Sequence, residues 1–269
     1  MQSLTEYLEF LHDALMSAQR AVMGSRRKGD TNVSLGIGYY GDETFQIDKD
    51  AEDAVIEQAY RYYKKPVIIT EERGVINGDS PYILVDPVDG STNARRDISV
   101  YATAIAVAED DRFNRIKAAG VIDHVTGRII WGSREAVYED WRAAKPSKVA
   151  NLQDAVVAFD SKLYRLPEKT KERVFSLVSS TKYPRILSTA ALETAYVATG
   201  RLDAYVAVEA KLRTFDCLPS LFLLKEARGY VNIGWERLAD IRLTTKDKFG
   251  YIAAANEKML RILSEAFNE

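Results

Sequence analysis

A short apolar segment leads directly into acidic, glycine and hydroxyl residues between residues 82 and 93. Its first part, residues 82–85, reads Tyr-Ile-Leu-Val, and such a run predicts a short buried β-strand. Asp86 and Asp89 follow three residues apart, and the ring of Pro87 restricts the turn between them. Both carboxylates can therefore face one hard cation, and the segment predicts a metal site at the end of a stiff strand.

The residues that follow these carboxylates suit an anion. Gly90 lets the backbone approach a ligand closely. Ser91 and Thr92 stand where a following helix would begin, and its free N–H groups and positive dipole end would attract a phosphate. The alternative is an ordinary Asp-Gly surface turn. The Asp-x-x-Asp spacing matches neither a calcium-binding loop nor the Asp-x-Asp of aspartyl-phosphate enzymes.

Two more segments place acids at the ends of predicted elements. The β-rich run at residues 67–70 ends on Glu71 and Glu72, and an adjacent acidic pair is costly to ionise unless a positive charge lies beside it. Asp216 precedes an apolar helical run at residues 218–224. As an isolated residue, Asp216 would be interpreted simply as the N-cap of that helix.

Together these segments resemble the inositol monophosphatase family of metal-dependent, lithium-sensitive phosphatases over most of the chain. The family signature is an Asp, then Glu-Glu, then Asp-Pro-(Ile/Leu/Val)-Asp-Gly-(Thr/Ser)-(Thr/Ser)-Asn, and a late Trp-Asp. This sequence offers in that order Asp48, residues 71–72, residues 86–93 and Phe215-Asp216, with Phe215 in place of Trp. The long segment 36–48 resembles the archaeal branch, whose members act on inositol monophosphate and fructose 1,6-bisphosphate.

The resemblance implies two or three Mg²⁺ ions in one active site, with Mn²⁺ as an alternative. Glu71, Asp86 and the backbone carbonyl of Val88 would hold one ion. Asp86, Asp89 and Asp216 would hold the second, and Glu71 would reach a weaker third ion through water. The acidic neighbour of Glu71 would support the site only indirectly.

The resemblance also implies contacts to phosphate and to the attacking water. The N–H groups of Gly90 and Ser91, with Thr92 beside them, would bind the phosphate. Asp48 and the Ser91 hydroxyl would orient the water, so Asp48, Glu71 and Ser91 are the implied catalytic residues.

Substrate choice is expected to depend on residues outside the metal cluster. Glu209, seven residues before Asp216, matches the position where inositol phosphatases place a glutamate on a sugar hydroxyl. Lys211 and Arg213 lie nearby, so a monophosphate is favoured and a bisphosphate stays open. Ser188 and Thr189 resemble the start of the family's substrate-contacting helix. A plain N-cap is the alternative for Ser188.

The implied reaction is Mg²⁺-dependent hydrolysis of inositol monophosphate by in-line attack of metal-activated water, with fructose 1,6-bisphosphate as a further substrate. Two alternatives stay open. One is a 3′(2′),5′-bisphosphate nucleotidase or NADP phosphatase of the same family, although no adenine-stacking motif is evident. The other is a catalytically silent binding protein, against which the converging carboxylates argue.

Composition supports an enzyme of ordinary globular type. The chain has 269 residues with 46% hydrophobic content, enough for a large core and two subdomains. A net charge of −2 disfavours a nucleic-acid partner, and a single cysteine, Cys217, excludes an internal disulfide. The sequence shows neither a signal peptide nor a membrane span, so we expect no membrane partner and a cytoplasmic location. A homodimer is implied by the resemblance alone.

The resemblance implies a layered αβαβα fold of the sugar-phosphatase type, and the patterns predict an α+β first part and an α/β second part. The expected subdomains are residues 1–143, with an antiparallel sheet and most metal ligands, and residues 144–269, with Asp216 and the substrate contacts. The active site should lie in the cleft between them. His12 and His124 are interpreted as surface or packing residues.

Specific elements are expected from hydrophobic periodicity and turn residues. They are helices near 4–22, 50–62, 167–180 and 189–200, a hairpin at 36–42, a charged loop at 26–30, and strands at 103–108, 118–122, 128–131, 155–159 and 204–208.

Overall fold

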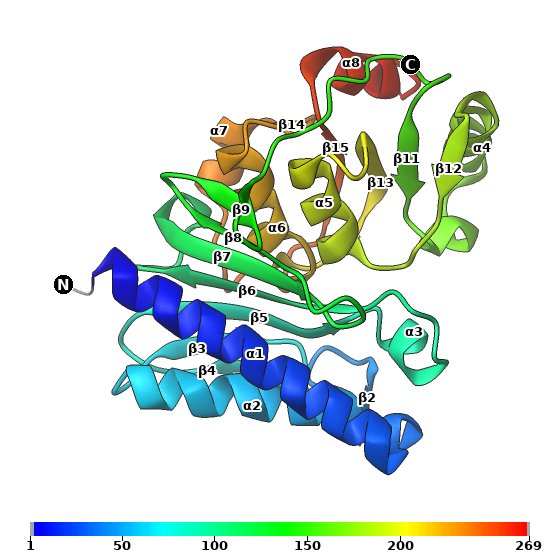
Figure 1. Cartoon of the computed structure of the whole chain (residues 1–269). Coiled ribbons are helices and arrows are strands. Elements are labelled where there is room, and N and C mark those ends of the chain that lie inside the picture. Colours follow the sequence, from blue (N-terminus) through cyan, green and yellow to red (C-terminus); the bar gives the residue numbers. More distant parts are fainter. Residues whose placement is uncertain (1–2, 268–269) are drawn as a thin grey trace.

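The structure, a computed structural model, describes residues 3–267 and has five layers (Figure 1). One pair of helices covers the outer face of a large sheet, a second pair lies between this sheet and a smaller one, and a third pair covers the far side of the smaller sheet. In that order the pairs are α1 (Leu4–Lys28) with α2 (Gln46–Tyr62), α5 (Ala190–Thr199) with α6 (Thr214–Glu226), and α4 (Glu168–Ser180) with α8 (Glu257–Glu265). The predicted αβαβα layering is confirmed.

The large sheet has eight strands in the order β10-β9-β8-β7-β6-β5-β3-β4. Its strands are β3 (Val67–Thr70), β4 (Gly74–Ile76), β5 (Tyr82–Asp89), β6 (Ala102–Ala108), β7 (Ile116–Asp123), β8 (Ile129–Ser133), β9 (Val137–Glu139) and β10 (Arg142–Ala143). Neighbouring strands are antiparallel except β3 and β5, which are parallel. The expectation of an antiparallel sheet therefore misses this one pair.

The smaller sheet has five strands in the order β12-β11-β13-β15-β14. These are β11 (Val156–Phe159), β12 (Tyr183–Arg185), β13 (Ala204–Leu212), β14 (Tyr230–Val231) and β15 (Phe249–Ala254). β11 is parallel to both of its neighbours, as expected for an α/β arrangement. The remaining elements are β1 (Ser34–Ile37), β2 (Glu43–Phe45), α3 (Ser91–Arg95), α7 (Trp235–Ala239), η1 (Asp30–Asn32), η2 (Phe113–Arg115) and η3 (Lys162–Arg165).

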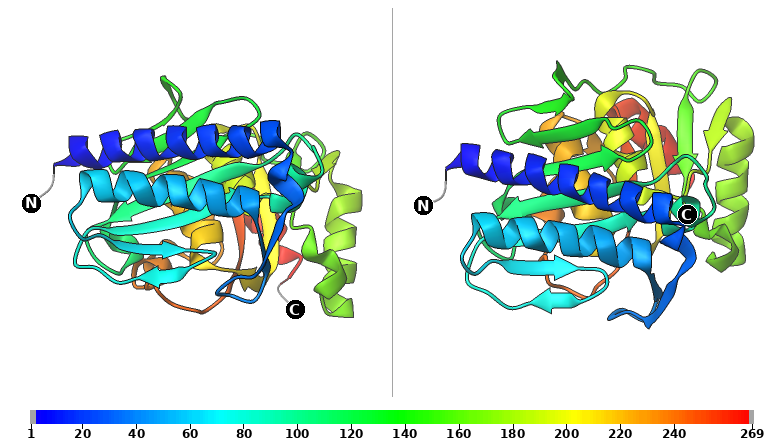
Figure 2. Two further views of the ribbon diagram at one scale, coloured as in Figure 1. Left: turned by 90° about the horizontal axis from the view of Figure 1, so that it is seen from below. Right: turned by 60° about the horizontal axis from the view of Figure 1, so that its bottom comes forward.

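The first two helices are longer than the sequence patterns predict, and they run side by side across the sheet (Figure 2). The expected charged loop at 26–30 is wrong in its first half, because its basic residues form the last turn of α1, where cations suit the helix dipole. Gly29, with φ 79°, then ends the helix. α2 begins at Gln46 instead of near residue 50, which puts Asp48 in its first turn.

The central strands are buried on both faces. In β5, Ile83 and Val85 pack against α1 and α2, whereas Leu84 faces the core that contains α5 and α6. A strand covered on both sides is apolar throughout, which explains the continuous run in the sequence. Its end is therefore held stiffly, at the point where the carboxylates begin.

The two sheets fall on either side of residues 143–144, where the subdomain boundary is expected. The last strand of the large sheet ends at Ala143, and the first strand of the smaller one begins at Val156. The subdomain boundary itself stays a prediction. The outer ends of the two expected subdomains, at residues 1–2 and 268–269, lie outside the described residues. Between residues 3 and 267, no helix has the length and apolar character that crossing a membrane requires.

The two histidines take different places. His12 lies on the exposed face of α1, and His124 is completely buried at the end of β7. His124 is therefore a buried residue and not a surface one.

Candidate active site

A cavity of about 380 Å³ opens where three parts of the chain meet: the end of β5, the start of α6 and the loop before α5. Six carboxylates line it, and four of them are those of Glu71, Asp86, Asp89 and Asp216. Asp216 comes from the part of the chain that carries the smaller sheet, and the other three belong to the large sheet or its loops. We call these four residues the floor of the cavity.

A β-bulge at the end of β5 aims two of the floor carboxylates. Asp86 pairs with Ala104 of β6 and Asp89 with Ala102, and the register shifts between them. The strand thus continues through Pro87 instead of ending before it. Proline is tolerated in a bulge because no ladder N–H is needed there. Bulges of this kind redirect side chains beside active sites, and here both carboxylates face the cavity although they are 3% and 6% exposed.

The other two floor carboxylates come from separate elements. Because β3 and β5 are parallel, their carboxyl ends lie at the same edge of the sheet, which brings Glu71 beside Asp86. Asp216 lies in the first turn of α6, and its Oδ2 accepts a hydrogen bond from the Arg213 N–H at 2.7 Å. It therefore caps the helix from within, rather than from the N-cap position itself.

Burial and mutual repulsion make this floor costly to ionise. Desolvation is the main cause that raises the pKa of all four carboxyl groups, to about 7 for Asp89 and well above the usual range for Glu71 and Asp86. The negative charges of neighbouring floor residues add to the increase. A cation between these groups would offset both effects.

The donor atoms of the floor fit a hard divalent cation. Oδ1 of Asp86 is buried and has no hydrogen-bond partner in the described part of the chain. The remaining donors are carboxylate and carbonyl oxygens, the ligands that Mg²⁺ and Ca²⁺ prefer. Within residues 3–267, no three acidic, histidine or cysteine side chains are already gathered tightly enough to hold an ion. The fit therefore rests on the unpartnered oxygen and on the chemistry of the donors.

Asp48 and Ser91 form a second feature next to the floor. The Ser91 hydroxyl lies 2.8 Å from Oδ1 of Asp48 and 2.8 Å from the Val88 carbonyl oxygen, and it can donate to either. The other oxygen of Asp48 accepts from the Phe45 N–H at 3.0 Å, which fixes the carboxylate at the start of α2. Burial raises the pKa of Asp48 to about 6.

Gly90, Ser91 and Thr92 line the cavity beside the floor. Gly90 has φ 87°, and a Cβ atom there would lie 2.6 Å from Cγ2 of Thr189. Both the backbone angle and the close approach require glycine. The phosphate-binding residues expected from the sequence thus lie in the same cavity as the expected metal ligands.

Four further lining residues, which we call the rim, are Asp42, Lys162, Ser188 and Arg213. Arg213 lies 2.6 Å from Oδ2 of Asp42 and 3.6 Å from Oε1 of Glu71. It also donates to the Tyr40 carbonyl, so it ties the loop between β1 and β2 to the floor. Ser188 has φ 65°, an unusual value for a residue other than glycine.

Sequence reasoning did not identify Asp42 or Lys162. Lys162 lies with Asp160 and Ser161 just after β11, and all three line the cavity. The available signal was topological, because polar residues that follow a parallel strand of an α/β sheet commonly face a ligand site. For Asp42 the sequence carries no comparable signal.

Three residues expected to contact substrate are not among those that line this cavity. Glu209 lines a separate cavity of about 870 Å³ between β13 and α8. Lys211 is outside the residues that line the 380 Å³ cavity, and Thr189 is buried with its N–H bonded to Glu193. Contact of these residues with a substrate stays a prediction.

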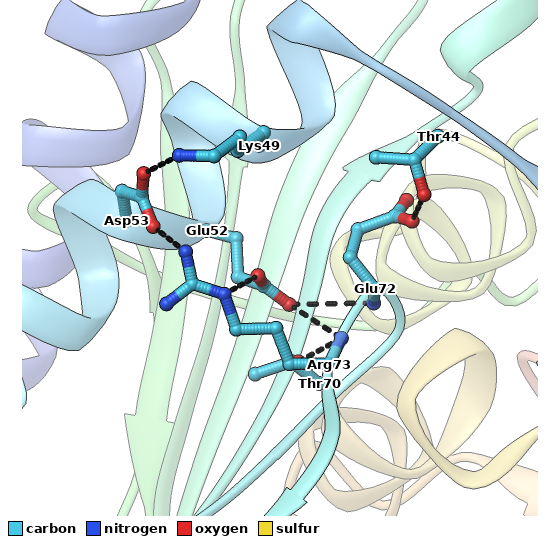
Figure 3. A network of polar contacts seen from close by, with 7 residues as sticks. All are labelled: Thr44, Lys49, Glu52, Asp53, Thr70, Glu72 and Arg73. Carbon is cyan, nitrogen blue, oxygen red and sulfur yellow. Dashed lines mark hydrogen bonds and ion pairs between the residues drawn. The ribbon is translucent and has the colours of Figure 1, made fainter. Parts of the chain in front are cut away.

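A polar network supports the turn that carries Glu71 (Figure 3). The buried carboxylate of Glu52 accepts from the N–H groups of Glu72 and Arg73, each at 3.3 Å. The Arg73 guanidinium lies 3.0 Å from Glu52 and also pairs with Asp53. On the far side, the Thr44 hydroxyl donates to Glu72. The turn is therefore fixed by α2 and by β2, not only by its own strand.

The chain is similar over nearly its whole length to one protein family. A sequence profile of the inositol monophosphatase family matches residues 4–267. The fructose-1,6-bisphosphatase/inositol-1-monophosphatase of Methanothermobacter thermautotrophicus is 30% identical over 263 residues, covering 91% of this chain and 92% of the relative. The protein of that name from Thermococcus kodakarensis is 28% identical over 257 residues, covering 92% and 91%. A crystal structure of the extragenic suppressor protein suhB from Bartonella henselae has a TM-score of 0.81 at 25% identity and covers 98% of both chains.

Proposed function

Since the chain belongs to the inositol monophosphatase family, we propose that it is a divalent-cation-dependent phosphatase acting on a sugar or polyol phosphate. One observation carries this proposal. The four floor carboxylates, which come from three separate segments, line one cavity together with Gly90, Ser91 and Thr92. A polyol-binding site alone would not require so much buried negative charge.

The floor carboxylates are the proposed ligands of Mg²⁺, with Mn²⁺ as an alternative. Glu71, Asp86 and the Val88 carbonyl would hold one ion, and Asp86, Asp89 and Asp216 a second. Bound ions would supply positive charge for the phosphate oxygens and lower the pKa of a coordinated water. The unpartnered Oδ1 of Asp86 supports its place in both ligand sets.

Asp48 and Ser91 would orient the attacking water. The Ser91 hydroxyl has one proton, so when it donates to Asp48 its oxygen lone pairs are free to accept from water. Asp48 is held by the Phe45 N–H, and it would fix the direction of that hydroxyl instead of acting as a strong base. The N–H groups of Gly90 and Ser91 would bind the phosphate.

Inositol monophosphate is the proposed substrate, and fructose 1,6-bisphosphate is a further one. The two archaeal relatives carry both activities in their names. In this chain the rim offers the Asp42 carboxylate for hydroxyl groups and two cationic side chains, Lys162 and Arg213, for a second anionic group. A cavity of about 380 Å³ is within the range of small-molecule sites.

The test is phosphate release from inositol 1-phosphate, fructose 1,6-bisphosphate, NADP and 3′-phosphoadenosine 5′-phosphate, each with Mg²⁺ and with excess chelator. We expect chelator-sensitive release from the first two substrates. Preference for either nucleotide would replace the substrate assignment with that of a nucleotide phosphatase. Release from none of them, by a folded protein, would favour a silent binding protein.

Further expectations follow from family membership. We propose inhibition by lithium, a homodimer, a cytoplasmic location, and subdomains that meet near residues 143–144 with the active site between them. A lithium titration of phosphate release tests the first, and light scattering during gel filtration tests the second.

A further inference from the structure

The bulge that aims Asp86 and Asp89 leaves one backbone group without its usual partner. Between these residues the pairing of β5 with β6 is interrupted, so the Pro87 carbonyl lies outside the regular ladder. Thr103 is the residue of β6 opposite this interruption, and its hydroxyl donates to the Pro87 carbonyl at 2.5 Å. A side chain thus replaces a backbone hydrogen bond at the centre of the bulge.

The Thr103 hydroxyl is itself held by His124. Nε2 of His124 lies 2.8 Å from Oγ1 of Thr103. Because the single hydroxyl proton of Thr103 points to Pro87, the imidazole must donate through Nε2–H. Burial lowers the pKa of His124 to about 3, so the ring is neutral and carries one proton. The chain of donors therefore runs from His124 to Thr103 to the Pro87 carbonyl.

The other ring nitrogen argues against simple packing. His124 is 0% exposed and stacks on Tyr101, a place that a phenyl ring could fill. Nδ1 has no hydrogen-bond partner within residues 3–267. An unpaired buried acceptor destabilises a fold, and a phenyl ring would avoid that cost. The donation from Nε2 to Thr103 is the contact that only histidine supplies here.

We propose that Thr103 and His124 are positioning residues that set the spacing of the Asp86 and Asp89 carboxylates. By holding the Pro87 carbonyl they fix the bulge, and the bulge fixes the direction of both side chains. The inference rests on the proposed cation site. It adds to that site two buried residues that touch neither substrate nor ion. Outer partners of this kind commonly change metal affinity when they are removed.

The test measures Mg²⁺ and Mn²⁺ binding to the whole chain by calorimetry. Thr103→Val keeps the side-chain shape but removes the hydroxyl, and we expect binding to weaken by about 10- to 100-fold. Thr103→Ser restores the hydroxyl and should return the affinity to within about threefold of wild type. His124→Phe keeps the stacked ring and removes the donor, with a loss smaller than that of Thr103→Val.

A matched control is available in the second half of the chain. Thr181 is also buried and donates to a backbone carbonyl, that of Leu177, and neither residue lines the 380 Å³ cavity. Thr181→Val should lower the melting temperature as much as Thr103→Val does, without changing ion affinity.

The outcomes distinguish failure of the proposed cation site from failure of the positioning role of Thr103 and His124. If wild type binds neither ion, the proposed cation site and this inference both fall. If wild type binds and Thr103→Val binds equally well, only the inference falls, and Thr103 is then a structural residue. Loss of binding in Thr103→Ser as well as in Thr103→Val would also contradict it.

Discussion

The floor and the rim of the cavity are built differently. Floor carboxylates leave a strand end, a bulge or the first turn of a helix, and a backbone N–H fixes Oδ2 of Asp89 and of Asp216. Asp42 and Ser188 of the rim lie on loops, and Asp42 keeps 68% of its side chain exposed. Stiff, buried supports suit groups whose geometry must be exact to within a fraction of an ångström, whereas exposed loops tolerate change. We therefore expect substitutions on the floor to affect catalysis and substitutions on the rim to affect substrate choice.

The largest expected effect is on the floor. Asp86→Asn removes a proposed ligand of both ions and should lower phosphate release at least about 100-fold. Because the substitution also replaces a buried carboxyl group that is costly to ionise, the metal-free protein should melt at a higher temperature than wild type. Calorimetric melting and a phosphate assay measure both. Retained activity would remove Asp86 from the metal site.

The next largest effect is expected from a change in the pair that would orient the water, Asp48 and Ser91. Ser91→Ala should lower kcat by about 10- to 100-fold and change KM little, because orienting the water matters mainly in the transition state. Steady-state kinetics separate the two parameters. A rise in KM with kcat unchanged would assign Ser91 to substrate binding instead.

The network in Figure 3 predicts that changes to the support of the floor will cause a smaller loss of cation affinity. Glu52→Gln keeps an acceptor for the turn but removes the charge that pairs with Arg73, so Mg²⁺ affinity should fall by about tenfold. Glu57→Gln, on the exposed face of the same helix and paired with Arg61, is the control. Equal affinities in the two variants would show that the turn does not depend on this buried charge.

Changes on the rim should alter affinity and leave turnover intact. Lys162→Met removes the charge with little change in length, and we expect KM for fructose 1,6-bisphosphate to rise about tenfold while kcat stays within twofold. KM for inositol 1-phosphate should change less, since it has no second phosphate. An equal rise for both substrates would place Lys162 at the phosphate that is hydrolysed.

Glu209 should give the smallest effect. Its family-like position implies a sugar contact, but in the structure it lines the separate 870 Å³ cavity. Glu209→Gln should therefore change KM for inositol 1-phosphate by less than about threefold. A larger rise would indicate that Glu209 contacts the substrate, as the family resemblance implies, although it lines a separate cavity.

The floor could be predicted from sequence because most of it is local. Residues 86–93 form one continuous run, and an apolar strand before acidic residues indicates by itself where they lie. The bulge at Pro87 could not be predicted, because it depends on Thr103 in the neighbouring strand and on His124 behind it. The parallel pairing of β3 and β5 was likewise hidden by the hairpins around it.

The rim was predicted less well for a physical reason. Asp42 and Lys162 reach the cavity only because loops far apart in sequence are folded together, and no periodic pattern marks them. Arg213 was noted for its charge, but its ion pairs with Asp42 and Glu71 require the folded chain. Tertiary packing, not local propensity, decides which loop residues face a site.

The four floor carboxylates are proposed to hold divalent cations together. Calorimetric titration of Mg²⁺ into wild type, Asp86→Asn, Asp216→Asn and the exposed control Asp240→Asn tests it most directly. We expect saturable binding to wild type and to Asp240→Asn, with a loss of at least about tenfold in affinity in the two floor variants. Equal binding by all four proteins would contradict it, because the cations would then bind elsewhere.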